Sequence, residues 1–128
     1  MKKEIFHIDF DGTIQENNYP EIGFLNEGVS EFLWTLKNLG YELILNSYRA
    51  NMNDNSLNDA LNFIKVHNLP IYKYNLEKIS PTDWKQLFFE NIFIDDECKG
   101  IPLKKSNRIF NKLIVDFETL NVLIQNSY

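Results

Sequence analysis

The chain has 128 residues, of which 44% are apolar and 14% aromatic, so it is long enough to bury one continuous core. Its formal net charge of −5 argues against a protein that mainly coats nucleic acid or an anionic membrane. No apolar run approaches the roughly 18 residues of a membrane span, and no signal-peptide pattern opens the chain. The one cysteine, Cys98, has no partner for an internal disulfide. We therefore expect a single domain, residues 1–128, in the reducing cytoplasm and without membrane association.

The first part of the chain alternates between apolar runs and helical spacing. Residues 4–10 (EIFHIDF) form a short run rich in β-branched and aromatic side chains, which predicts a buried strand. Apolar residues then recur at helical spacing from Val29 to Leu39, and Gly40 supplies a stop signal. Residues 41–47 (YELILNS) form the next apolar run and predict a second strand.

The same alternation continues further along the chain. An apolar helical face runs from Leu57 to Ile64 and predicts a second helix. Residues 71–75 predict a third strand, and Ser80-Pro81 starts a short helix with proline at its first position. Residues 91–94 (NIFI) predict a fourth strand.

The C-terminal part is predicted to end in one more helix, with Asp116 as its N-cap. We also expect a fifth strand between Lys99 and Leu113. The apolar side chains that the last helix turns inward are predicted to be Phe117, Leu120, Leu123 and Ile124. The alternating elements together predict an α/β fold: a Rossmann-like, doubly wound, mainly parallel sheet with helices on both faces.

Sheets of this kind place ligands beyond the carboxyl ends of their strands, and polar residues gather at those positions here. Two carboxylates about 4 Å apart at an effective dielectric near 20 repel by roughly 4 kcal/mol, so such a cluster calls for a bound cation or shared protons. Because no cysteine and histidine set has zinc-like spacing, an all-oxygen site predicts Mg²⁺. The residues concerned are Asp9, Asp11, Gly12 and Thr13 after the first strand, Ser47 and Arg49 after the second, and Asp95 and Asp96 after the fourth.

A Mg²⁺ site beside an anion site points to phosphate chemistry. Asp9 is placed to attack phosphorus and form an aspartyl-phosphate, and Asp11 is suited to protonate the leaving oxygen and later to activate water. Gly12 allows a sharp turn that brings backbone N–H groups to the phosphoryl oxygens. The hydroxyl of Thr13 is expected to fix that turn.

The segment HIDFDGTI resembles the DxDGT signature of the haloacid dehalogenase-like (HAD) phosphohydrolases. LILNS resembles the second motif of the family, which implies that Ser47 hydrogen-bonds the phosphoryl oxygens. IFIDDE resembles the fourth motif, which implies that Asp95 binds Mg²⁺ with Asp96 beside it. In the family, the nucleophile's carboxylate and the backbone carbonyl two residues later complete the protein ligands, and these map to Asp9 and Asp11.

The sequence is most similar to small, cap-less bacterial and phage members of that superfamily. YPEIG follows the first motif, an arginine lies two residues past the second, and GIP follows the fourth. Residues 14–45 leave no room for a folded cap domain. The resemblance therefore implies an open site, which in this superfamily accompanies large substrates or capping by a neighbouring subunit.

Two positions remain open to more than one interpretation. The third motif of the family is a lysine or arginine that neutralises the nucleophile and the phosphate. Lys85 approximates its spacing in the cap-less relatives and is favoured, while Lys78 in KISP resembles the Lys-x-x-Pro form. Arg49 is either a phosphate or substrate contact or a surface salt bridge.

His7, inside the first strand, is expected to be a satisfied buried residue rather than a catalyst.

The function predicted from the sequence is Mg²⁺-dependent hydrolysis of a phosphorylated small molecule. One alternative is a non-catalytic regulatory module that binds Mg²⁺ or phosphate, as a receiver domain does. Another is a nucleic-acid end-processing phosphatase: the net charge argues against it, while the open site and the basic residues between Lys99 and Lys112 are compatible with it. Trp34 lies off the apolar stripe of its helix, which leaves a homo-oligomer contact open.

Overall fold

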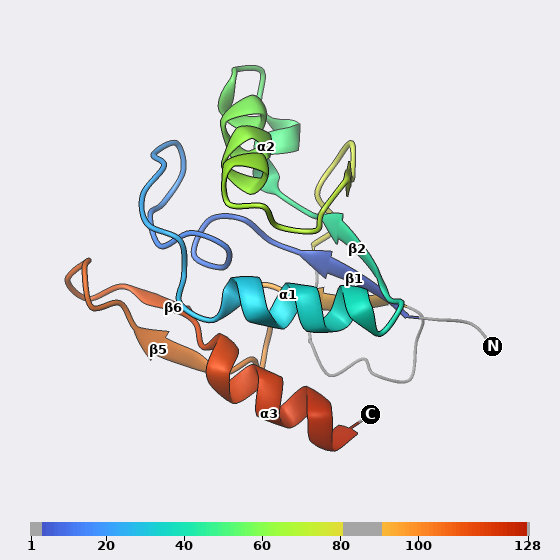
Figure 1. Cartoon of the computed structure of the whole chain (residues 1–128). Coiled ribbons are helices and arrows are strands. Elements are labelled where there is room, and N and C mark those ends of the chain that lie inside the picture. The colour runs from blue at the N-terminus through green and yellow to red at the C-terminus, as the bar shows by residue number, and fades with distance from the viewer. Residues whose placement is uncertain (1–3, 81–90, 128) are drawn as a thin grey trace.

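The computed structural model describes residues 4–80 and 91–127, and its centre is a four-stranded parallel sheet (Figure 1). The strand order is β3-β2-β1-β4, so β1 is central and pairs in parallel with both β2 and β4. This arrangement confirms the predicted Rossmann-like α/β class with a parallel sheet. The strands are β1 (Ile5–Ile8), β2 (Glu42–Leu45), β3 (Lys73–Tyr74) and β4 (Asn91–Ile94).

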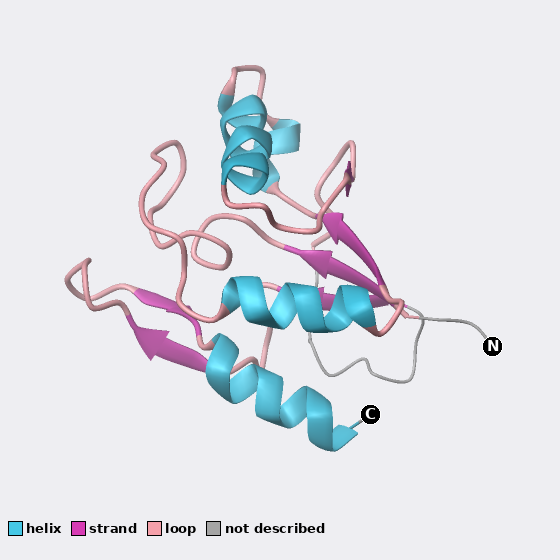
Figure 2. Cartoon of the chain, viewed as in Figure 1, coloured by secondary structure: helices cyan, strands magenta, loops and turns pink. Residues whose placement is uncertain are grey.

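The helices flank the sheet, and their apolar side chains join those of the strands in one buried core (Figure 2). α1 (Val29–Asn38) and α2 (Ser56–Val66) lie where the apolar spacing predicts helices, and a 3₁₀ turn, η1 (Tyr48–Asn51), follows β2. Gly40 ends α1 with a φ of 92°, a backbone conformation that glycine adopts at no steric cost. All residues between Thr13 and Asn46 are described, and they form a loop, α1 and β2 without an inserted cap domain.

The last helix, α3 (Phe117–Ser127), confirms Asp116 as its N-cap. The Asp116 carboxylate accepts hydrogen bonds from the backbone N–H and the hydroxyl of Thr119, at 3.2 and 2.8 Å. α3 packs beside α1, as the ring contact of Phe117 with Phe32 at 5.1 Å shows. The predicted inward position of Leu123 is wrong: this side chain is 37% exposed, because the contact face of α3 runs through Phe117, Leu120 and Ile124.

Residues 99–115 contain the expected fifth strand, although not in the main sheet. β5 (Leu103–Lys105) pairs in antiparallel fashion with β6 (Leu113–Val115), which the sequence analysis does not predict. The two strands form a hairpin beside the parallel sheet (Figure 1). Its base is held to the loop after β1, since Val115 N–H donates to Gly12 O at 3.1 Å. The helix predicted to start at Ser80-Pro81 lies, apart from Ser80, outside the described residues.

His7 lies inside β1 and is a buried polar residue, as predicted. His7 is buried, and its two ring nitrogens lie 2.8 Å from Asn91 Oδ1 and 3.1 Å from Asn75 Nδ2. Its ring also stacks on Phe93 at a centroid distance of 4.7 Å. Burial lowers the pKa of His7, so the ring stays neutral and serves as a satisfied structural group, as expected. None of the described helices has the length and apolar character needed to cross a lipid bilayer.

Candidate active site

The candidate site lies at the carboxyl edge of the sheet, defined here as the edge where β1, β2 and β4 end. The strand ladder continues one residue beyond the strands: Asp9 N–H donates to Ile94 O at 2.9 Å, and Asn46 N–H donates to Ile8 O at 2.8 Å. Because these bonds fix the backbone of Asp9, its side chain leaves the sheet in a defined direction. Asp95 follows β4 in the neighbouring position, so the two carboxylates meet.

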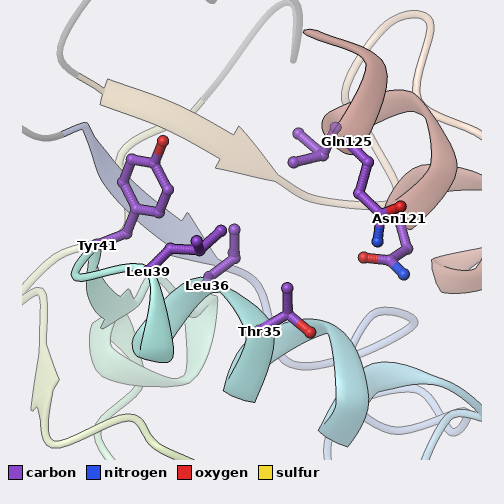
Figure 3. A pocket seen from close by; sticks show the side chains of 7 residues that line it. Thr35, Leu36, Leu39, Tyr41, Asn121 and Gln125 are labelled. Carbon is purple, nitrogen blue, oxygen red and sulfur yellow. The ribbon is translucent and has the colours of Figure 1, made fainter. Parts of the chain in front are cut away.

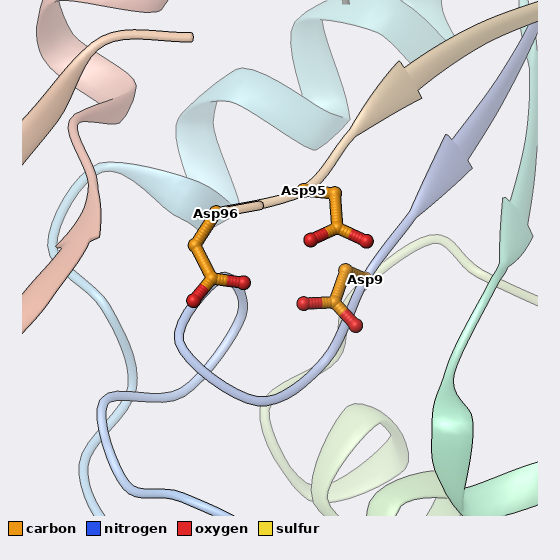
Figure 4. Close-up of side chains that lie close together, drawn as sticks. All are labelled: Asp9, Asp95 and Asp96. Atoms are coloured by element: carbon orange, nitrogen blue, oxygen red, sulfur yellow. The ribbon is translucent and has the colours of Figure 1, made fainter. Parts of the chain in front are cut away.

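Three carboxylates converge at this edge, and Figure 4 shows them pointing toward one another from β1 and β4. One oxygen of each of Asp9, Asp95 and Asp96 lies within 4.8 Å of the others. Asp9 and Asp95 are buried, with 4% and 1% of their surface exposed. Burial, followed by repulsion from Asp95, raises the pKa of Asp9. Burial likewise raises the pKa of Asp96 to about 6. Asp9 and Asp96 therefore retain their protons to higher pH than ordinary aspartates do.

Lys78 supplies a positive charge to this cluster. Its Nζ donates to Asp9 Oδ1 at 3.2 Å and lies 2.9 Å from Asp95 Oδ2. Burial lowers the pKa of Lys78, but the carboxylates of Asp9 and Asp95 outweigh burial, and the net shift is upward. Lys78 thus contacts two of the three carboxylates. Lys85, the candidate favoured from the sequence, lies outside the described residues.

The oxygen atoms of the three carboxylates are also suitable ligands for a cation. Asp95 Oδ1 accepts a hydrogen bond from Glu97 N–H at 2.9 Å, whereas the buried Oδ2 accepts no well-directed hydrogen bond from the described residues. Its contact with Lys78 is an ion pair. A buried carboxylate oxygen with spare capacity, beside two further carboxylates, is a donor set that suits a hard divalent cation.

The loop after β1 brings its own backbone close to the cluster. Gly12 has a φ of 76°, and a Cβ built on it would lie 2.5 Å from Asp96 Oδ2, so both conformation and space require glycine. Thr13 Oγ1 donates to Asp9 Oδ2 at 3.1 Å and accepts from Asp96 N–H at 3.2 Å. Thr13 therefore joins the two acidic segments, in addition to fixing the turn as predicted.

Asp11 does not share the cluster through its side chain. Its carboxylate turns instead toward Arg49, whose Nη2 lies 2.6 Å from Oδ1, and toward Gln15 Nε2 at 2.9 Å from the same oxygen. The ligand role implied for Asp11 concerns its backbone carbonyl and is independent of this side-chain position. Asp9, Asp95 and Asp96 are thus the predicted carboxylates that the fold brings together.

Ser47 and Arg49 both lie in the segment after β2. Ser47 Oγ accepts a hydrogen bond from Arg49 N–H at 3.1 Å, and since a hydroxyl both donates and accepts, its proton is still able to donate. Arg49 is fully buried. Of the two interpretations of Arg49, the salt bridge is present, to Asp11 at 2.6 Å, but its predicted position at the surface is wrong, because the guanidinium is enclosed by protein groups.

Asn46 is a buried residue of this edge that the sequence analysis overlooked. Its side chain accepts a hydrogen bond from Ile79 N–H at 2.8 Å and donates to Ile79 O at 2.9 Å. The Asn46 amide oxygen also accepts from Asn75 Nδ2 at 3.0 Å. These bonds hold the segment that carries Lys78. The sequence pattern that indicates this role is an asparagine directly after an apolar strand, because a buried amide there needs hydrogen-bond partners.

A cavity of about 370 Å³ opens beside the cluster and is lined by Tyr48, Lys78, Ser80, Asp95 and Glu97. A second cavity of about 250 Å³ lies between α1 and α3, far along the chain from the carboxylates (Figure 3). The described residues that line this second cavity include no carboxylate, lysine, arginine, histidine or cysteine. Of these two cavities, the one beside the cluster is lined by carboxylates and a lysine.

Comparisons with known proteins support the fold. A solved structure of a conserved protein from Bacteroides thetaiotaomicron is similar, with a TM-score of 0.63 and 25% sequence identity. The alignment covers 99% of this chain and 93% of that chain. No protein-family model matches the sequence, and the search of curated proteins finds no match. The likeness supports the α/β fold over the length of the chain.

Proposed function

We propose that this protein is a Mg²⁺-dependent phosphomonoester hydrolase that forms an aspartyl-phosphate on Asp9, in the manner of the cap-less HAD phosphohydrolases that its motifs resemble. The observation that carries the proposal is the position of the Asp9 carboxylate. It is buried among Asp95 and Asp96, with Thr13 bonded to one oxygen and Lys78 to the other. A carboxylate so oriented at a strand end is suited to nucleophilic attack.

The residues at the carboxyl edge would divide the reaction into two displacements. In the first, an Asp9 oxygen attacks phosphorus, the bond from phosphorus to the leaving oxygen breaks, and Asp11 gives its proton to that oxygen. In the second, Asp11 takes a proton from water while the water oxygen attacks phosphorus. The bond from phosphorus to Asp9 then breaks, which releases inorganic phosphate and restores the free carboxylate.

The surrounding groups would stabilise the charge that develops on the phosphoryl oxygens. Lys78 offsets the negative charge of Asp9, and the Ser47 hydroxyl is able to donate a hydrogen bond. Asp9 and Asp95 would hold Mg²⁺, with the Asp11 carbonyl as a further ligand. Bound there, Mg²⁺ would neutralise and orient the phosphoryl group.

The substrate class that fits is a phosphorylated small molecule. The cavity beside the cluster, about 370 Å³, falls in the size range of small-molecule sites and has one exposed aromatic wall at Tyr48. The net charge of −5 disfavours a polynucleotide substrate.

The direct test is hydrolysis of p-nitrophenyl phosphate by the wild type and Asp9→Asn, each with Mg²⁺ and with EDTA. We expect turnover that needs both Mg²⁺ and Asp9, while the nearly isosteric variant keeps its circular dichroism spectrum. Asp59→Asn, which changes an exposed carboxylate on α2, is the matched control and should retain full activity. Equal activity of folded Asp9→Asn and the wild type would overturn the covalent mechanism. Mg²⁺ binding without turnover of a panel of phosphomonoesters would favour the regulatory module.

A further inference from the structure

The guanidinium of Arg49 is saturated with protein partners. Nε donates to Asp11 Oδ2 at 2.9 Å, with a longer contact of 3.3 Å to Oδ1. One terminal nitrogen, Nη2, donates to Asp11 Oδ1 at 2.6 Å and to Glu21 O at 2.8 Å. The other, Nη1, donates to Ser56 O at 3.2 Å and to Pro20 O at 3.3 Å. An arginine has five N–H donors, and all five are used here, so none remains for a phosphoryl oxygen.

The position of Arg49 is also fixed by aromatic contacts and by complete burial. Its guanidinium carbon lies 4.9 Å from the centre of the Phe10 ring and 5.5 Å from that of Tyr19. Arg49 has no exposed side-chain surface, whereas Asp11 retains 17%. The arginine is therefore closed off from solvent, and the carboxylate that it holds is still accessible.

Gln15 completes the same arrangement from the other side. Its amide nitrogen donates to Asp11 Oδ1 at 2.9 Å and to Glu21 O at 3.0 Å, and its amide oxygen accepts from Gly23 N–H at 3.0 Å. Residues 16–24, named here the flap loop, are thus bonded to the two side chains that hold Asp11. Asp11 Oδ1 receives three of these bonds and Oδ2 only one.

We infer that Arg49 is a positioning residue for the Asp11 carboxylate, rather than a phosphate ligand, and that together with Gln15 it couples the orientation of Asp11 to the flap loop. This inference rests on the proposed function for its catalytic meaning, because Asp11 is the proposed acid and base. Whether Arg49 bonds to Asp11 and not to phosphate can be tested without measuring activity.

The first experiment tests the contact of Arg49 with Asp11 in the folded wild-type protein. The chain has two arginines, Arg49 and Arg108, so two side-chain Nε–H signals are expected in the ¹⁵N NMR spectrum. We expect the Arg49 signal to move in Asp11→Asn and to stay in place when inorganic phosphate and Mg²⁺ are added to the wild type. A signal that moves with phosphate, or that ignores Asp11→Asn, would overturn the inference. No Arg49 variant has to fold for this test.

The second experiment measures the coupling in turnover. Arg49→Lys should lower kcat for an alkyl phosphate at least about tenfold. Complete loss of general acid and base catalysis would lower it by roughly 10²–10⁴-fold, which sets the upper limit of the effect. The effect should be smaller for p-nitrophenyl phosphate, whose leaving group needs little protonation, and KM should change little. Lys73→Arg, a change of cation at an exposed position of β3, is the control and should have no effect on kcat.

A double-mutant cycle separates positioning from direct binding of phosphate. In an Asp11→Asn background, Arg49→Lys should cause no further loss of kcat, because the group that Arg49 positions is already disabled. An equal loss in both backgrounds, or a rise in KM with unchanged kcat, would overturn the inference. If the proposed function itself fails, the wild type shows no turnover on any substrate, and the NMR result still decides the contact of Arg49.

Discussion

Lys78 Nζ lies 3.2 Å from Asp9 Oδ1, and this contact places a buried cation against the proposed nucleophile. The Lys78 side chain is only 12% exposed, so the pair is shielded from the solvent screening that weakens surface ion pairs. A second contact at 2.9 Å joins Lys78 to Asp95. One ammonium thus offsets part of the charge of a three-carboxylate cluster, and its removal should affect both chemistry and metal binding.

We expect Lys78→Met to lower kcat by about 10²-fold or more, the usual effect of removing a preorganised charge that stabilises a transition state. The carboxylates would also lose their nearest positive charge, so the rise in melting temperature on adding Mg²⁺ should be larger than in the wild type. Lys73→Met is the matched control, since Lys73 is 70% exposed and pairs with Glu42 at the surface. An effect of Lys73→Met equal to that of Lys78→Met would contradict the assigned role.

Gly12→Ala should damage the site more than its backbone strain alone explains. The positive φ of 76° costs an alanine about 1–2 kcal/mol, and the new Cβ would lie 2.5 Å from Asp96 Oδ2. Gly28→Ala provides the control: its φ is 86°, but its Cβ would meet Phe117 Cβ at an ordinary 3.4 Å. Both variants should lose stability in chemical denaturation. Only Gly12→Ala should also lose the stabilisation by Mg²⁺, and retention of that stabilisation would contradict the proposed site.

Without metal, Asp96 should make the free energy of unfolding fall as pH rises from about 4 through about 6. The pKa of Asp96 is raised from 3.8 to about 6 in the folded protein, chiefly by burial. Because the folded state binds this proton more tightly than the unfolded state, the stability that it contributes is present below the unfolded pKa and lost as pH rises through the folded one. The loss is on the order of 2–3 kcal/mol. The pKa of Asp9 is raised in the same direction.

The measurement is thermal unfolding in EDTA at several pH values, with the wild type and Asp96→Asn compared. Carboxylates with a lowered pKa, such as Asp54, act in the opposite direction, so the difference between the two proteins isolates Asp96. The variant should gain stability relative to the wild type at high pH and not at low pH. Added Mg²⁺ should raise the melting temperature more at about pH 8 than at about pH 5, because protons compete for the same oxygens. A larger rise at the lower pH would exclude the carboxylate cluster as the metal site.

The sequence predicts the strands and strand-end acids well because local chemistry determines them. β1, β2 and β4 are nearly continuous apolar runs, as buried parallel strands require. Once they are parallel, their carboxyl ends must share one edge, so the meeting of Asp9 with Asp95 follows from topology. The amphipathic helices are equally local in origin.

The remaining features depend on where loops return in space. The burial of Arg49 requires the carbonyls of Pro20 and Glu21, which no sequence pattern brings to it. Asn46 likewise acquires its role from Ile79, 33 positions along the chain. β6 was missed because a three-residue strand shows too little alternation to be distinguished from a loop.

The central claim is that Asp9 becomes phosphorylated during turnover. The direct measurement is a rapid acid quench of the wild type mixed with substrate and Mg²⁺, followed by mass spectrometry of its peptides. We predict one phosphoryl group on the peptide that contains Asp9, formed within the first turnover and absent when EDTA replaces Mg²⁺. Turnover without a phosphoryl group on Asp9, or with the group on another residue such as Asp95, would contradict the account.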